Sequence, residues 1–394
     1  MKFFAYLICY CIYPFSFLFP RRKKKWAFGS FRGAFNDNAK YLFIHASEHM
    51  PEITSAWISI NKDTVREIRA KGLRAYHVFS LKGIGYALTS KYWFFNAYSS
   101  DIMFCLSGGA KQVNLWHGLP LKRIEFDIDS GLLADRYVKK TLKERYYHPE
   151  VFRRPDYMVT STDLFSEVFA RSFRVSPDRC LGFGLARNGI LTWSEEKRMA
   201  FIKRYEPTAT MDLIAELKRY EKVFIYMPTW RDSQSDFIAV GFDFGALDSA
   251  LADNNALFII KPHANTTVDS DAIAGLNHIK LLPTTMDVYP ILPYSDVLVT
   301  DYSSIMYDYI LMEKKDVILY LFDYQEYINE RPFIWPFDEM SYGHRAYDFA
   351  TLLNLVCDHA LCPDEDAKAV LADKCWGNYG NNASERIALF FQQC

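Results

Sequence analysis

Five short polar segments carry side chains that could do chemistry, and each follows an expected strand. They read Trp-His-Gly-Leu-Pro-Leu-Lys (116–122), Gly-Phe-Gly-Leu-Ala-Arg-Asn (182–188), Met-Pro-Thr-Trp-Arg-Asp (227–232), Lys-Pro-His (261–263) and Thr-Asp-Tyr-Ser-Ser (300–304). In an open α/β sheet, ligands bind at the carboxyl ends of the strands. One such segment is weak evidence, because a lone histidine after a strand is structural more often than catalytic. The five together predict one ligand site.

The side chains of these segments suit a substrate that carries a diphosphate. Arginine and lysine neutralise phosphate charge, and hydroxyl and helix N–H groups complete the hydrogen bonds of the oxygens. Histidines add groups that exchange a proton near neutral pH. The candidate residues are His117, Gly118, Lys122, Arg187, Thr229, Arg231, Lys261, His263, Asp301, Ser303 and Ser304.

The segment 296–309 predicts a buried strand, a polar turn and an apolar helix that runs from Ile305 through Leu311. The turn holds residue types that cap helix N-termini, namely Thr300, Asp301, Ser303 and Ser304. A helix N-terminus carries partial positive charge and unpaired N–H groups, so it can bind a phosphate. The alternative is an ordinary turn with a serine cap, and the turn alone does not decide between them.

Strands and helices alternate along the chain, which predicts an α/β fold with two Rossmann-like domains facing a cleft. At 394 residues the chain is too long for one typical core. The first expected strands are 26–30, 53–60, 75–79, 93–97, 113–116, 157–160 and 180–184. The second series is 223–227, 256–261, 279–282, 297–300 and 317–321. We therefore expect domains at 26–200 and 201–394, with the last helix (385–393) packing back on the first domain.

Residues 1–25 predict a membrane-associating segment. The run Phe3–Phe19 is almost wholly apolar, and the basic cluster Arg21–Lys25 follows it. The run lacks a small-residue cleavage site, and its basic residues lie on the wrong side for a signal peptide. With Pro14 inside it, the run is marginal for a membrane span, so it either crosses the bilayer or lies in the interface. A third interpretation is a buried first helix of the folded domain.

Residues 135–154 combine basic and aromatic side chains. A solvated helix face and a second membrane-surface patch are equally good interpretations of this stretch.

Charge and cysteine content exclude several classes of protein. The net charge of −1 gives no sign of a nucleic-acid-binding protein, and the 8 cysteines form no pattern typical of a metal site. Scattered thiols in a chain of this size are typical of a reducing compartment. We expect no metal, no other cofactor and no nucleic-acid partner.

The five motifs, in this order, resemble those of the CDP-glycerol glycerophosphotransferases, the teichoic-acid primases and polymerases. The segment Phe-Asp-Tyr-Gln-Glu-Tyr (322–327) resembles the family as well, and the resemblance extends over roughly residues 26–390. The chain departs from the family at Leu119, where the family usually has threonine, and at Ala186, where it usually has proline. The compact length resembles the primase-type members more than the longer polymerases.

The resemblance implies a fold and a reaction. The fold is two-domain and glycosyltransferase-B-like (GT-B-like). The reaction is transfer of glycerol phosphate from CDP-glycerol to a hydroxyl of a polyprenyl-linked saccharide or growing polymer, with release of CMP. The N-terminal domain would bind the acceptor and the C-terminal domain CDP-glycerol, at the cytoplasmic face of the cell membrane.

The resemblance also implies roles for single residues. His117 would be the general base, and His263 with Lys261 would contact the diphosphate and stabilise the leaving CMP. The other phosphate contacts would come from Thr229, Arg231, Ser303 and Ser304, with Arg187 as a weaker candidate. Gly118 and Lys122 would bind substrate beside His117. Asp301 would either hold its turn or orient His263.

Three alternatives remain open. The donor could be CDP-ribitol or another CDP-linked polyol, which the sequence does not distinguish from CDP-glycerol. The enzyme could instead be a nucleotide-sugar glycosyltransferase of GT-B fold, in which an acidic residue often serves as the base. A membrane-bound scaffold that binds nucleotides without turnover is the non-enzymatic alternative.

Overall fold

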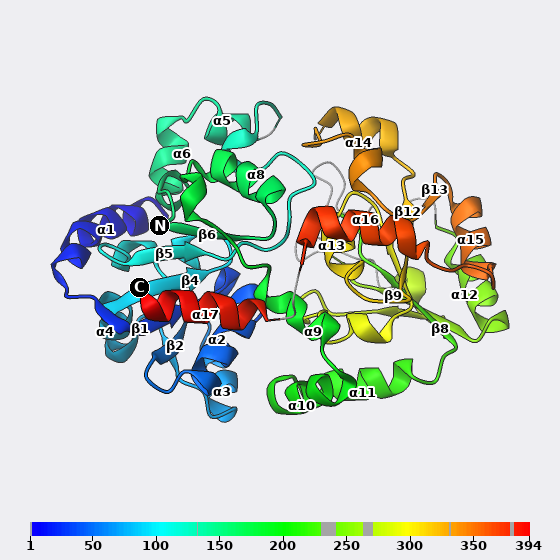
Figure 1. The fold of residues 1–394 in the computed structure, drawn as a ribbon, viewed down its shortest axis with the longest axis horizontal. Helices are drawn as coiled ribbons and strands as arrows, with labels where there is room; N and C mark the ends of the chain where they lie inside the picture. Colours follow the sequence, from blue (N-terminus) through cyan, green and yellow to red (C-terminus); the bar gives the residue numbers. More distant parts are fainter. Residues whose placement is uncertain (1, 132, 230–241, 263–270, 331, 379–381) are drawn as a thin grey trace. The chain divides into compact units, whose positions relative to one another are not determined.

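The computed structural model of the chain describes residues 2–131, 133–229, 242–262, 271–330, 332–378 and 382–394 (Figure 1). These residues form two compact units. The first unit comprises Met1–Leu119, Arg123–Gly189 and Trp376–Cys394. The second unit comprises Pro120–Lys122 and Ile190–Cys375. Each unit contains its own parallel sheet.

The sheet of the first unit has the strand order β3-β2-β1-β4-β5-β6-β7. Its strands are β1 (Arg22–Phe28), β2 (Thr54–Ser59), β3 (Ala75–His77), β4 (Ser90–Phe95), β5 (Lys111–Asn114), β6 (Tyr157–Thr160) and β7 (Cys180–Gly182). The pairs that the structure describes are parallel, so the carboxyl ends of these strands lie at one edge. His117 and Arg187 follow β5 and β7 at that edge.

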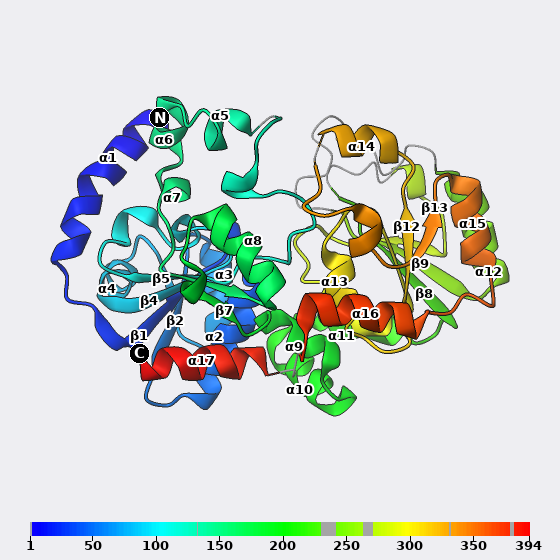
Figure 2. The same ribbon diagram turned by 45° about the horizontal axis from the view of Figure 1, so that its top comes forward.

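The helices of the first unit cover both faces of this sheet (Figures 1 and 2). They are α1 (Lys2–Phe15), α2 (Asp37–His49), α3 (Lys62–Ala70), α4 (Leu81–Thr89), α5 (Ala134–Tyr137), α6 (Leu142–Tyr147), α7 (Pro149–Phe152), α8 (Asp163–Phe173) and α17 (Ala383–Gln393). The C-terminal helix α17 packs against α2, and its Phe391 contacts Tyr92 and Phe94 of β4. The last described segment of the chain is therefore part of the first unit.

Helix α1 lies along the first unit beside α6, and both views show the two side by side (Figures 1 and 2). Tyr10 donates a hydrogen bond to the carbonyl of Arg145 at 2.9 Å and stacks on Tyr146. The opposite side exposes large apolar side chains, with Phe4 67%, Ile8 59% and Phe15 63% exposed. Within the described ranges, none of the helices has the length and apolar character needed to cross a bilayer.

The basic cluster that follows α1 is built into the sheet, and its members differ in exposure. Arg21 donates hydrogen bonds to the carbonyls of Ala87 (2.6 Å) and Leu106 (2.8 Å), and burial lowers its pKa to about 10. Strand β1 then starts at Arg22, four residues earlier than the sequence predicts. Arg21 is thus a structural residue, whereas residues 22–24 are exposed.

The second unit has the strand order β10-β9-β8-β11-β12-β13. Its strands are β8 (Lys222–Tyr226), β9 (Ala256–Ile260), β10 (Ile279–Leu281), β11 (Val297–Thr300), β12 (Asp316–Tyr320) and β13 (His344–Ala346). Its helices are α10 (Glu195–Tyr205), α11 (Thr208–Leu217), α12 (Phe244–Asp253), α13 (Ile305–Tyr309), α14 (Tyr324–Glu330), α15 (Phe349–Cys357) and α16 (Glu365–Trp376), and α9 (Gly189–Thr192) starts at the boundary between the units. Apolar residues of β8, β9, β11 and β12 form one core with α12 and α15.

Two further local expectations differ from the structure, and a third stretch is described in more detail by it. Strand β13 is absent from the prediction, because a run of His, Arg and Ala has no apolar pattern. The helix expected from Ile305 through Leu311 ends at Tyr309, and a turn follows it. The basic-aromatic stretch 135–154 forms the short helices α5, α6 and α7, and it supplies the aromatic surface on which α1 packs.

Candidate active site

His117 lies in a sharp turn directly after β5. Trp116 has a φ of +53° and Gly118 a φ of +144°, so residues on both sides of His117 adopt left-handed backbone conformations. Glycine tolerates such a conformation and tryptophan does not, so surrounding contacts must hold Trp116 in place. The turn keeps the His117 ring at the exposed surface of the first unit.

Asn38, Asn96 and Asn114 hold this turn, and we call them the asparagine cluster. All are buried. The amide oxygen of Asn114 accepts the N–H of Trp116 at 2.9 Å, and the amide nitrogen of Asn38 donates to the Trp116 carbonyl at 2.9 Å. The backbone N–H and the backbone carbonyl of Trp116 are therefore both bonded to buried side-chain amides, and these bonds fix the position of His117.

The third member of the cluster fixes the tautomer of His117. The Nδ1 atom lies 3.2 Å from the backbone carbonyl oxygen of Asn96. A carbonyl oxygen only accepts hydrogen bonds, so Nδ1 carries the proton of the neutral ring and Nε2 keeps its lone pair. Desolvation by the surrounding protein is the largest influence on His117 and lowers its pKa. The charge of Asp37 and the hydrogen bond to Asn96 raise the pKa, and the charge of Arg187 lowers it further. The neutral ring, which can accept a proton at Nε2, is therefore favoured near pH 7.

A second layer supports Asn96 itself. Its amide oxygen accepts the N–H of Ala39 in the first turn of α2 at 2.9 Å, and its amide nitrogen donates to Ser30 at 2.8 Å. The Asp101 carboxylate accepts the N–H groups of Asn96 (3.1 Å) and Ala97 (2.9 Å), and burial raises its pKa to about 7. The loop after β4 is thereby bonded to α2, which carries the next part of the site.

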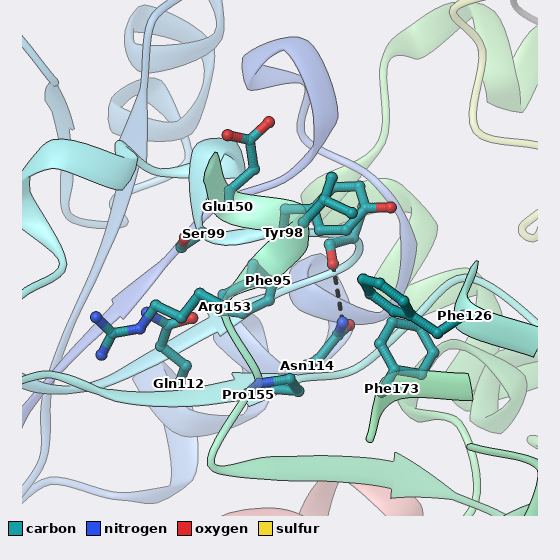
Figure 3. A pocket seen from close by; sticks show the side chains of 12 residues that line it. Phe95, Tyr98, Ser99, Gln112, Asn114, Phe126, Glu150, Arg153, Pro155 and Phe173 are labelled. Carbon is teal, nitrogen blue, oxygen red and sulfur yellow. Dashed lines mark hydrogen bonds between the residues drawn. The ribbon is translucent and has the colours of Figure 1, made fainter. Parts of the chain in front are cut away.

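Asn114 also borders a small pocket (Figure 3). Its amide nitrogen donates to the carbonyl of Ala97 at 2.8 Å, shown as the dashed line in Figure 3. Phenylalanine rings 95, 126 and 173 form much of the wall, with Gln112 beside them. The same asparagine thus joins the wall of this pocket to the turn of His117.

Arg187 lies in a buried ion pair. Its Nη1 atom donates to the carboxylate of Asp37 at 2.6 Å, and its side chain is only 7% exposed. The backbone N–H of Arg187 donates to the amide oxygen of Asn38 at 3.0 Å. The sequence predicts a phosphate contact for Arg187, and the structure shows a guanidinium that is already bonded to a carboxylate.

In the second unit, Asp301 supports the neighbouring turn. Its carboxylate accepts the N–H of Thr229 (2.9 and 3.1 Å) and the N–H of Tyr302 (2.6 Å). Thr300 reaches the same neighbour, because its hydroxyl donates to the carbonyl of Met227 at 2.7 Å. Of the two roles expected for Asp301, these bonds support the one in which it holds the turn.

Lys261 points into the protein. Its ammonium group donates to the carbonyl of Thr284 at 2.9 Å and, at 3.4 Å, to that of Pro262. Burial lowers its pKa to about 8, against the opposing charge of Asp287. Lys261 therefore joins the end of β9 to the segment after β10, and it is less accessible to a phosphate than the sequence predicts.

Ser303 and Ser304 remain half-buried at the start of α13. The Ser304 side chain makes no capping hydrogen bond, and Ser303 accepts the N–H of Ile305 at 3.4 Å. Lys122 donates to the hydroxyl of Tyr327 at 2.7 Å within the second unit. His263 and Arg231 lie outside the described residues.

Comparison with known proteins gives the family. A model of the family CDP-Glycerol:Poly(glycerophosphate) glycerophosphotransferase matches residues 11–390. The chain belongs to this family. It is similar to the teichoic acid glycerol-phosphate transferase of Staphylococcus aureus, with 28% identity over 315 residues that cover 77% of this chain and 75% of the relative. It is also similar to the teichoic acid poly(glycerol phosphate) polymerase of Bacillus spizizenii, with 25% identity over 83% of this chain and 81% of the relative.

The fold of this glycerophosphotransferase is also that of a solved structure. The wall teichoic acid polymerase TagF matches with a TM-score of 0.75 and 20% identity, over 95% of this chain and 89% of that one. The match confirms the expected architecture of two GT-B-like α/β sheets.

The residues that support the site of this glycerophosphotransferase are not apparent from its sequence. Asp37, Asn38, Asn96 and Asn114 all contact the turns of His117 or Arg187, directly or through one another. The available signal was weak: Asn96 and Asn114 each end an apolar strand, where a polar side chain faces the site edge. Nothing in the sequence joins them to His117, because the contacts depend on the strand order.

Proposed function

We propose that this protein transfers glycerol phosphate from CDP-glycerol to a hydroxyl of a lipid-linked saccharide or growing polymer, in teichoic acid synthesis. Membership of the glycerophosphotransferase family supports the reaction type. The observation that supports the mechanism is the exposed His117, whose Nδ1 is bonded to the Asn96 carbonyl.

The proposed step begins at Nε2 of His117. This atom takes the proton of the acceptor hydroxyl, and the hydroxyl oxygen forms a bond to the phosphorus that carries glycerol. The bond from that phosphorus to the oxygen of the CMP group breaks, and CMP leaves with the electron pair. The products are the glycerol-phosphate ester of the acceptor, CMP and a proton held by His117. The first unit binds the acceptor in this proposal, and the second unit binds CDP-glycerol.

The proposed ligands in the second unit belong to the polar segments that follow β8, β9 and β11. Ser303 and Ser304 are half-buried, and Thr229 is half-buried in the turn that Asp301 holds. His263 and Arg231, which belong to the motifs 261–263 and 227–232, are the other proposed ligands. Lys261 and Asp301 act by holding these turns.

CMP release tests the reaction and the base together. The purified protein is incubated with a lipid-linked acceptor, EDTA and, in parallel, CDP-glycerol, CDP-ribitol or a UDP-sugar. We expect CMP from CDP-glycerol, and a loss of about 10³-fold in kcat in the His117→Ala variant, the size typical of a lost general base. If CDP-ribitol alone gives CMP, the proposed donor is wrong and the proposed mechanism stands. If only a UDP-sugar is turned over, the proposed reaction itself is wrong.

His77 provides a matched control for His117. It also lies at the carboxyl end of a strand of the first unit, and its Nε2 is 3.1 Å from the carbonyl oxygen of Ile60. The His77→Ala variant should keep its activity within about threefold, because the contacts of this ring in the described part of the chain, to Ile60 and Phe79, involve none of the candidate site residues. Equal losses in the two variants would contradict a specific role for His117.

We also propose that the protein acts at the cytoplasmic face of the membrane, on which α1 lies. The exposed apolar side of α1 supports this placement, since Phe4, Ile8 and Phe15 each have more than half of their surface exposed. The exposed basic residues at 22–24 would contact anionic lipid.

Flotation with lipid vesicles tests the membrane placement. The double variant Phe4→Ser with Ile8→Ser should bind anionic vesicles at least about a hundredfold more weakly, because each large apolar side chain contributes about 1.5–3 kcal/mol when buried. Leu389→Ser, which removes an exposed apolar side chain from α17, is the control. Unchanged flotation of the double variant would contradict the role of α1.

A further inference from the structure

The ion pair between Asp37 and Arg187 lies at the turn of the expected base. Arg187 is almost fully buried and Asp37 is 20% exposed at the side chain, so the pair is only partly screened by water. Asp37 has a φ of +60°, a left-handed conformation that is uncommon outside glycine and that aspartate adopts more readily than most residues. A residue held in such a conformation needs support from its neighbours.

Asn38 provides that support and joins the pair to His117. Its amide oxygen accepts the N–H of Arg187, and its amide nitrogen donates to the carbonyls of Trp116 (2.9 Å) and Leu115 (3.4 Å). One buried amide therefore holds three segments together: the start of α2, the turn of His117 and the turn of Arg187. Neither charge of the pair can move far without disturbing these bonds.

The charges of the pair act on the imidazole in opposite directions. Burial is the largest influence on His117 and lowers its pKa; the Asp37 carboxylate raises it, and the Arg187 guanidinium lowers it. Among the described residues of the surrounding elements, α2 carries the buried Lys40 and the loop after β4 carries Asp101, whereas α8 presents the apolar rings of Phe169 and Phe173 to Trp116.

We propose that Asp37 is a positioning residue, with Arg187 as its counterion, whose carboxylate stabilises the imidazolium that His117 becomes when it accepts the acceptor's proton. This inference rests on the proposed function, in which His117 is the base. Asp37 favours the protonated ring, and Arg187 limits this effect so that the ring is neutral before the reaction. Arg187 thus acts through Asp37 and not as a phosphate ligand.

The decisive measurement is the titration of His117 by NMR on protein with ¹³C-labelled histidine. The chain has 9 histidines, and the His117→Gln variant assigns the signal of interest. Asp37→Asn should lower the pKa of His117, because a negative charge is lost and Arg187 remains. Arg187→Met should raise the pKa, because the opposing positive charge is lost. Each shift should be about 0.5–1 pH unit, the size of one nearby charge that is partly screened.

Opposite shifts of the His117 pKa in the two variants distinguish an effect of the charges on His117 from structural support alone. If the ion pair were only structural, replacing either residue would disturb the site in the same way. The two variants would then shift the His117 pKa in the same direction or not at all. Either of these results would overturn the inference. Asp63→Asn, which removes an exposed carboxylate from the first turn of α3, is the matched control and should not move the His117 signal.

Activity provides a second readout that can fail independently. In CMP release from CDP-glycerol, the acidic limb of the kcat profile should move to lower pH in Asp37→Asn and to higher pH in Arg187→Met. If the wild-type protein releases no CMP, the proposed function fails, while the NMR titration still decides whether the pair acts on His117. Opposite NMR shifts with unmoved pH profiles would show that His117 is not the base.

Discussion

The turn of His117 in the first unit and the turn Thr300–Ser304 in the second are both polar segments after a buried strand. They differ in which residues hold them. Around His117, the buried asparagine cluster bonds the backbone, and the imidazole stays exposed. In the second unit, the motif holds its neighbour: Thr300 and Asp301 make hydrogen bonds to Met227 and Thr229 in the segment after β8 of the same chain.

The difference shows that residue type at a strand end does not determine whether a side chain binds substrate. Asp301 and Lys261 have the charges that a ligand site would use, and both are bonded to backbone groups of their own unit. His117 is an exposed residue, and its Nδ1 atom is bonded to a backbone carbonyl. A side chain can therefore be assigned to chemistry or to support only after its partners are known.

The largest effect is expected from Asp301→Ala. The variant leaves the N–H groups of Thr229 and Tyr302 without their acceptor, and each unpaired buried donor costs about 1–3 kcal/mol. We expect the free energy of unfolding to fall by about 4 kcal/mol in urea titrations. Amide hydrogen exchange at residues 229 and 302 should become faster.

Ser303→Ala is the control for Asp301→Ala. Ser303 belongs to the same turn, and within the described residues its hydroxyl oxygen accepts just one long hydrogen bond, from the N–H of Ile305 at 3.4 Å. Its removal should change stability by less than about 0.5 kcal/mol. If Asp301→Ala leaves stability and exchange unchanged but weakens donor binding, Asp301 is a ligand and the comparison between the two turns is wrong.

The fold could be predicted from the sequence because buried parallel strands are short apolar runs, and most of them are visible as such. The exceptions have physical reasons. Strand β1 starts with exposed basic residues, since Arg22 and Lys25 pair in register with Ser90 and Thr54 and need no apolar side chains there. Strand β13 is too short and polar to show a pattern.

The site could be predicted only in part. His117 and the Thr300–Ser304 turn stand out by residue type, and their roles stay predictions. The asparagine cluster and Asp37 were not found, because Asn38 and Trp116 are far apart in sequence and meet only through the strand order of the sheet. The inward orientation of Lys261 was equally invisible, since it depends on the carbonyl of Thr284.

Glu125→Gln should give the next largest effect, and one that depends on pH. Glu125 follows the His117 turn and accepts the hydroxyls of Tyr98 (2.6 Å) and Tyr137 (3.0 Å). Burial raises its pKa from 4.5 to about 7, against the opposing hydrogen bonds from both tyrosines. A carboxyl group whose pKa is higher in the folded protein than in the unfolded chain contributes its full stabilisation at pH values below the unfolded pKa. This contribution is lost as the pH rises through the folded pKa of about 7.

Thermal unfolding of the Glu125 variant at several pH values tests this expectation. The stability of the wild type relative to Glu125→Gln should fall by about 2 kcal/mol between pH 5 and pH 8, because each unit of pKa shift corresponds to about 1.4 kcal/mol. Glu67→Gln, at the exposed surface of α3, controls for the loss of a carboxylate. A difference that does not change with pH would mean that Glu125 stays charged in the folded protein.

The smallest effect is expected from Lys261 in the second unit, with the opposite dependence on pH. Burial lowers its pKa from 10.5 to about 8, so the unfolded chain binds more protons than the folded one above pH 8. Wild-type stability relative to Lys261→Met should therefore rise by about 1 kcal/mol between pH 8 and pH 9. Lys261→Arg is the control, since its guanidinium does not titrate in this range. If the wild type and Lys261→Met respond to pH in parallel, the ammonium group is accessible to water and to a phosphate, and Lys261 returns to the set of expected ligands.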